Sequence, residues 1–165
     1  MPRSFLILCA FFAATSGFAS SQDNVRVEPS DLQGPRPLQK QTQAAAIRDY
    51  LRSWQSLRIA LEQNRADVLD ADFVGVAKDK LADTVRQQAK LGIHTRYQDR
   101  AHDLQIVFYS PDGLSLELKD TVEYDVQVID HDKSQMTQSV RAHYVVVLTP
   151  AEVRWKVRVF QSVPD

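Results

Sequence analysis

The sequence predicts an α+β domain in which N-terminal helices pack on the concave face of a curved antiparallel β-sheet. Between residues 40 and 92, apolar side chains recur every three or four positions, as in helices. After His94 they alternate every second position, as in strands with one wet face. The longest alternating run, 114–128, would extend about 50 Å as a straight strand, so we expect it to bend. A bent sheet covered by helices encloses a cone.

The first 19 residues have the three parts of a secretory signal peptide. Arg3 lies near the amino terminus, an apolar run covers 5–14, and Gly17 and Ala19 precede a cleavage site. The run is shorter than the ~20 residues of a membrane helix, so we expect no integral membrane segment after cleavage. We predict cleavage after Ala19 and export to the periplasm or the medium. Cys9 leaves with the signal, which excludes a disulfide or a cysteine-ligated metal in the mature protein.

Residues 20–38 are predicted to be a flexible leader, because prolines lie among polar residues without apolar periodicity. A single domain is expected over 39–165. Its first helix should span about 40–63 and end at Asn64, followed by a helical turn at 66–72 and a further helix after Gly75. Gly92 can end that helix in the left-handed conformation, with Leu91 facing inward.

The second half should form a meander of adjacent strands. Leu104, Ile106 and Phe108 are expected to face inward on the first clear strand, before a tight turn at 110–113. The run 114–128 has its apolar residues at even positions, and a polar turn follows at 131–135. Strands at 140–148 and 153–159 close the domain around a turn at 149–152.

Several residues occupy characteristic places in this order of elements. Trp54 lies on the long first helix, Phe73-Val74-Gly75 follows the helical turn, and Tyr144 and Trp155-Lys156-Val157 lie on the closing strands. The chain resembles the nuclear transport factor 2-like superfamily, also called SnoaL-like or cystatin-like, over about 39–163. The resemblance implies a cone-shaped fold with an internal pocket. The superfamily contains isomerases, cyclases, dehydratases and scaffolding proteins, so the resemblance selects no single activity.

Asp120 is the candidate catalytic residue. Catalytic members of the superfamily place a carboxylate inside the cone, often with a histidine or tyrosine, and Asp120 is the one charged residue in phase with the even apolar face of 114–128. If the strand is uninterrupted, Asp120 faces inward as a general base, assisted by Tyr124 or His102. If 119–121 forms the bend, Asp120 turns outward, and we favour this alternative. For His102 we favour a surface position.

The predicted pocket lining consists of large apolar and aromatic side chains that could equally fill a core. These residues are Trp54, Phe73, Leu118, Tyr124, Tyr144 and Trp155. The four histidines lack the spacing of a metal site, and no phosphate loop or serine elbow occurs, so we predict no metal and no cofactor. With 20 basic against 21 acidic residues, a nucleic-acid partner is not expected.

The sequence therefore favours a non-catalytic exported domain that binds a small apolar ligand or a protein partner. The alternative is a cofactor-independent lyase or isomerase that uses a carboxylate in the cavity. On the wet face of the sheet, charged residues are interrupted by Val107, Val145, Val147 and Phe160. We favour a solvated face whose charges pair with one another across the strands, and the alternative is a homodimer or partner surface at these apolar residues.

Overall fold

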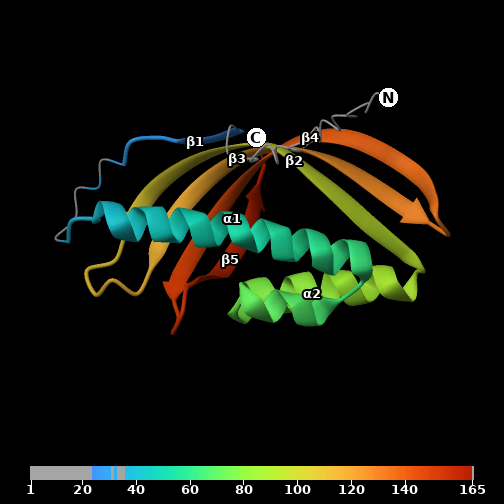
Figure 1. The fold of residues 1–165 in the computed structure, drawn as a ribbon, viewed down its shortest axis with the longest axis horizontal. Helices are drawn as coiled ribbons and strands as arrows, with labels where there is room; N and C mark the ends of the chain where they lie inside the picture. Colours follow the sequence, from blue (N-terminus) through green and yellow to red (C-terminus); the bar gives the residue numbers. More distant parts are fainter. Residues whose placement is uncertain (1–23, 31, 33–35, 165) are drawn as a thin grey trace, which may run out of the picture.

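The computed structural model describes residues 24–30, 32 and 36–164, and the predicted signal peptide and its cleavage site lie outside this range. Helix α1 (Lys40–Gln63), the short 3₁₀ helix η2 (Ala66–Ala71) and helix α2 (Gly75–Lys90) precede four long strands. These strands are β2 (Ile93–Tyr109), β3 (Leu116–Asp130), β4 (Lys133–Pro150) and β5 (Trp155–Val163). Figure 1 shows the sheet arching over α1, with α2 beneath one end. The α+β prediction is confirmed.

A short strand within the segment expected to be a leader makes the sheet mixed instead of wholly antiparallel. Strand β1 (Val25–Val27) pairs in parallel with His102–Leu104 of β2, and the sheet order is β1-β2-β3-β4-β5. Leu32 and Leu38 of the same segment pack against the core. The Val-Arg-Val alternation suits this position, because β2 leaves a free edge where a strand can add.

The helices begin and end close to the predicted residues. Asn64 ends α1 in the left-handed conformation at φ 55°, and its backbone N–H bonds to the carbonyl of Ala60. Gly92 has φ 70°, as expected after α2, but Leu91 is 71% exposed and does not face inward. Leu91 already lies beyond the last helical residue, so it does not continue the buried face of α2. Among the described residues, no helix has the length and hydropathy needed to cross a membrane.

The sheet bends through bulges in the neighbours of β3, and not in β3 at the predicted position 119–121. The extra residues are Arg100 and Val107 in β2, Gln135 in β4 and Arg158 in β5. Strand β3 contributes no extra residue to these pairings, so its alternation runs unbroken from Leu116 through the middle of the strand. The even positions of β3 from Leu116 to Tyr124 are therefore all buried beneath the helices.

The bulges at Val107 and Arg158 reverse which residues of their strands face the core. Beyond Val107, Tyr109 is buried and Phe108 is 48% exposed, which contradicts the predicted inward position of Phe108. Beyond Arg158, Phe160 stacks on Tyr144 at 4.5 Å between ring centroids, so it belongs to the core and not to the outer face. A strict two-residue period cannot anticipate these reversals, because one inserted residue shifts the phase of everything after it.

Candidate functional site

A buried polar cluster joins helix α1 to the middle of the sheet. The hydroxyl of Tyr50 donates to Asp120 Oδ2 at 2.7 Å, and His102 Nδ1 lies 2.8 Å from the same oxygen. All three residues are buried, and Asp120 is 1% exposed. The other carboxylate oxygen, Oδ1, is also buried and has no hydrogen-bond partner among the described residues. A charged group so enclosed is costly unless its partners compensate it, so the cluster needs a structural or chemical reason.

The register of the sheet explains why these residues meet. Asp120 pairs with Leu104 of β2, and His102 lies two residues earlier, paired with Val122. Both side chains therefore point to the concave face, where Tyr50 reaches them from α1. Of the two alternatives for Asp120, the inward one is correct and the favoured outward one is wrong, because β3 has no bulge at 119–121. The surface position favoured for His102 is also wrong, since His102 is 5% exposed.

Tyr50 acts in this cluster as a hydrogen-bond donor. Burial raises the pKa of the Tyr50 hydroxyl well above its ordinary value, and the nearby Asp120 carboxylate raises it further. The phenol therefore keeps its proton throughout the physiological range. The sequence offered Tyr124 or His102 as the residue that assists Asp120. His102 does lie within hydrogen-bond distance of Asp120, but the tyrosine that does so is Tyr50 and not Tyr124.

Aromatic rings enclose the cluster on its inner side. The Trp54 ring lies edge-on to His102, with ring centroids 5.3 Å apart, and it also contacts Tyr124, Tyr144 and Phe160. The indole Nε1 of Trp54 is buried without a hydrogen-bond partner among the described residues. This apolar wall excludes water from Asp120, which strengthens its interactions with His102 and Tyr50.

The predicted pocket residues divide between this core and its margin. Trp54, Phe73, Leu118 and Tyr124 are buried, whereas Tyr144 and Trp155 are half-buried and pack against the core. Their packing against one another accounts for their burial without a ligand. That they line a ligand pocket stays a prediction.

The cluster approaches solvent through a cleft between α1 and the edge formed by β1 and β2. The cleft has a volume of about 410 Å³, and His102 is among its lining residues. Arg48, Arg52 and Arg58 line it from α1, and Asp99 and Arg100 line it from β2. The bulge at Arg100 brings Asp99 and His102 to the same concave face although they are three residues apart. Sequence analysis missed Asp99 for this reason, and nothing in its spacing would have revealed it.

We expect Asp99→Asn to stabilise the protein increasingly as the pH rises. Burial raises the pKa of Asp99 above its ordinary 3.8, an effect that Arg58, 3.7 Å away, opposes. The folded wild type therefore holds the Asp99 proton more tightly than the unfolded chain does. This contribution to the free energy of unfolding is fully present below the unfolded pKa and is lost as the pH rises through the folded pKa. Thermal unfolding at pH 4 and pH 7 should therefore show the melting temperature of the variant, relative to wild type, higher at pH 7.

Asp125→Asn is the matched control for this measurement, with the opposite sign. Hydrogen bonds from Ser139 and Arg100 lower the pKa of Asp125, so the wild type gains stability as the pH rises through that value. Because this pKa lies below 3.8, the melting temperature of the variant should fall relative to wild type mainly as the pH rises from about 2 to about 4, and should change little between pH 4 and pH 7. An Asp99→Asn difference that shrinks from pH 4 to pH 7 would contradict the burial of that carboxylate.

Two further buried carboxylates tie the helical layer to β5 and its turn. Asp49 on α1 accepts the backbone N–H of Trp155 at 2.9 Å. Asp72 accepts the hydroxyl of Ser56 at 2.5 Å and is paired with Arg154 at 3.1 Å. Both carboxylates have partners that link separate elements, so we assign them to the scaffold.

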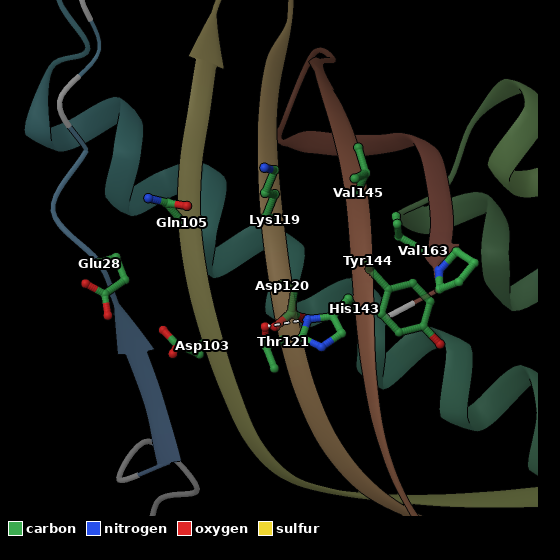
Figure 2. A pocket seen from close by; sticks show the side chains of 11 residues that line it. Glu28, Asp103, Gln105, Lys119, Asp120, Thr121, His143, Tyr144, Val145 and Val163 are labelled. Carbon is green, nitrogen blue, oxygen red and sulfur yellow. Dashed lines mark hydrogen bonds between the residues drawn. The ribbon is translucent and has the colours of Figure 1, made fainter.

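The outer face of the sheet carries a second, shallower groove of about 420 Å³. Figure 2 views it with the helices behind the strands, and Asp103, Lys119 and Thr121 lie along its floor. Thr121 Oγ1 lies 2.9 Å from His143 Nδ1, the contact drawn as a dashed line. Acidic and basic side chains are mixed here, so the groove has no single charge preference. Val145, one of the residues predicted for a homodimer surface, lines this groove, whereas Phe160 belongs to the core.

Comparisons with known proteins place the fold. No family model matches the chain, and no curated protein matches it. The intermembrane space region of the chloroplast protein ARC6 matches with a TM-score of 0.63 at 15% identity, covering 79% of this chain and all of that region. A periplasmic fragment of TraM matches with a TM-score of 0.51 at 13% identity, covering 73% of this chain and 98% of the fragment.

A candidate scytalone dehydratase from Novosphingobium aromaticivorans matches with a TM-score of 0.52 at 14% identity, over 76% of this chain and 89% of the other. At these identities the likeness concerns the fold alone. The α1 helix across a curved sheet is the arrangement that the sequence resemblance implied, and the chain has the nuclear transport factor 2-like fold.

Proposed function

We propose that the domain catalyses proton transfer at a carbon atom, as a cofactor-independent lyase or isomerase, with His102 as the acid–base residue. The observation that carries the proposal is the short contact between His102 Nδ1 and Asp120 Oδ2 at the base of a cleft. A carboxylate at Nδ1 favours the tautomer that has its proton on Nδ1. The other ring nitrogen, Nε2, is then a base for a molecule in the cleft.

Asp120 and Tyr50 are positioning residues in this proposal. Asp120 holds the imidazole and stabilises the imidazolium that forms when Nε2 takes a proton. Tyr50 donates to the same carboxylate oxygen and fixes its position from α1. The C–H electron pair forms a carbon–carbon double bond, either as a leaving group departs or before the proton returns at another carbon. This differs from the sequence-based alternative, in which Asp120 was itself the base.

The fold is compatible with such an activity, because a similar structure carries the name of a dehydratase. A second observation favours the non-catalytic binding domain that the sequence favoured. The rings of Trp54, Tyr144 and Phe160 fill the interior by packing on one another. Such packing stabilises a domain whether or not a reaction takes place inside it, so it also suits a non-catalytic function. The state of His102 distinguishes the two functions.

Nitrogen-15 NMR of the histidine rings tests the proposal. We expect neutral His102 to carry its proton on Nδ1, and Asp120→Asn to change the ring signals. The full chain should also catalyse hydrogen–deuterium exchange of a ketone or hydroxy-ketone from a panel in D₂O, and His102→Gln should slow this by roughly 10²- to 10⁴-fold. His143→Gln, on the outer face, is the matched control and should leave the rate unchanged.

A neutral His102 that carries its proton on Nε2 would overturn the proposal. In that state Nδ1 accepts a hydrogen bond from a protonated Asp120, and Nε2 cannot act as a base. The cluster would then be a polar link between helix and sheet, and the binding function would stand. Exchange that survives in His102→Gln would equally exclude His102 as the acid–base residue.

We propose further that the protein is exported after cleavage at Ala19. Two of the similar structures are described as an intermembrane space region and a periplasmic fragment, which supports a compartment outside the cytoplasm. Fractionation of cells that make the full chain, with mass measurement of the product, should find a protein that begins at Ser20. An uncleaved protein in the cytoplasm would contradict export.

A further inference from the structure

Four of the residues that line the cleft beside His102 are arginines. Arg48 and Arg52 lie one turn apart on α1, Arg58 lies further along the same helix, and Arg100 lies at the β2 bulge. The one acidic side chain in the lining is Asp99. Arg48, Arg52 and Arg58 thus line the cleft from the helix side, whereas the guanidinium of Arg100 is held by Asp125 on the other face of the sheet. A concave surface of one charge raises the local concentration of ligands with the opposite charge.

The ion pairs of these arginines leave one of them available. Arg48 pairs with Asp49 at 3.1 Å, Arg58 with Asp99 at 3.7 Å, and Arg100 with Asp125 at 2.6 Å. Arg52 makes no ion pair or hydrogen bond with another residue in the described part of the chain. Its side chain is exposed on the helix face that forms the cleft wall. A guanidinium fork without a partner matches a carboxylate or phosphate group.

The remaining lining is apolar or neutral. Val25 of β1 and Leu51 of α1 contribute aliphatic surface, and Gln55 adds an amide next to Arg52 along the helix. The cleft therefore combines a charged rim with an apolar patch, close to the imidazole of His102. A volume of about 410 Å³ admits a small organic molecule and not a folded partner.

We propose that this cleft binds a small organic anion, whose carboxylate or phosphate group is held by Arg52 while its carbon skeleton lies toward His102. The inference rests on the proposed function for the identity of the site, and it gives the substrate class: a carbon acid that bears an anionic group. Arg52 fixes the orientation of the ligand, so that a C–H bond can face the imidazole. Binding of the anion requires no turnover and can be measured separately from it.

Binding of benzoate to the full chain, followed by amide and arginine side-chain NMR signals, tests the inference. Benzamide has the same shape without the charge and serves as the ligand control. We expect benzoate to shift signals of the cleft residues, benzamide to have little effect, and Arg52→Gln to weaken benzoate binding about tenfold. Arg86→Gln, which removes an exposed arginine of α2 paired with Asp83, should bind benzoate as wild type does.

The other arms separate the sources of the anion. Phenyl phosphate that binds more tightly than benzoate assigns the site to phosphate esters, and the reverse assigns it to carboxylates. Inorganic phosphate alone that shifts the same signals equally reveals an unselective anion site, which would overturn the orienting role of the carbon skeleton. Equal binding of benzoate and benzamide, or unchanged binding in Arg52→Gln, would overturn the inference.

The inference and the proposed function can fail independently. If the cleft binds the anion but neutral His102 carries its proton on Nε2, the cleft is a binding site and the proposed catalysis is wrong. Exchange activity on uncharged ketones with no dependence on Arg52 would keep the catalysis and remove the anionic substrate class.

Discussion

Replacing Trp54 with alanine is expected to lower the free energy of unfolding by about 3–5 kcal/mol. Trp54 is 2% exposed and its ring contacts those of His102, Tyr144 and Phe160. Removing it opens a cavity at the centre of the cone, where rings from α1, β2, β4 and β5 converge and cannot collapse together. Urea unfolding followed by circular dichroism measures the loss.

The matched control for Trp54 is Phe108→Ala. Phe108 is 48% exposed beyond the Val107 bulge, so its removal should shift the urea midpoint little. A Trp54→Ala protein that retains nearly all its stability would show that the interior tolerates a void. It would then have the loose cone of a ligand-binding pocket, as the sequence predicted.

Asp120→Ala is expected to cost about 3 kcal/mol or more, and Asp120→Asn distinctly less. Alanine leaves the Tyr50 hydroxyl and the His102 ring nitrogen buried without their shared acceptor. Asparagine keeps the shape and can still accept one of the two hydrogen bonds. Adding Tyr50→Phe to Asp120→Ala should recover part of the loss, because the double variant no longer buries an unpaired hydroxyl.

The same urea measurements on Asp125→Ala provide the control for Asp120. Asp125 lies on the outer face, where it pairs with Arg100 and accepts a hydrogen bond from Ser139. Its removal should lower the unfolding midpoint much less than Asp120→Ala does, because an exposed ion pair contributes little to stability. Similar midpoints for Asp120→Ala and Asp125→Ala would show that the buried cluster adds nothing to stability beyond its surroundings. The position of Asp120 would then need an explanation in function alone.

The helical layer could be predicted from the sequence to within a residue or two. The periodicity of α1 and the stop at Asn64 are local properties, set by side chains on neighbouring turns and by one left-handed residue. The order of the strands from β2 to β5 also followed from the turn signals, because short turns force adjacent strands to pair. Strand β1 did not follow, since its three residues gain a pairing partner only from the distant edge of β2.

The functional site could be predicted only in part. Asp120 was singled out because a charged residue interrupts an apolar face, which is visible in the sequence itself. Whether it points inward depended on where the sheet bends, and that is decided by packing across strands. The bulges fell in β2, β4 and β5, so β3 kept its phase and Asp120 stayed inside.

The sequence alone determined the α+β class, the amphipathic helix, the order of strands β2 to β5 and the choice of Asp120 as a candidate residue. Only the tertiary structure decided which residues lie around Asp120. Tyr50 comes from a helix 70 residues earlier, His102 from the neighbouring strand, and the arginines from the wall of the cleft. The physical reason is that periodicity records which face a residue occupies, whereas hydrogen bonds between elements depend on register. A single bulged residue such as Arg100 changes that register, and nothing in the spacing of the sequence marks it.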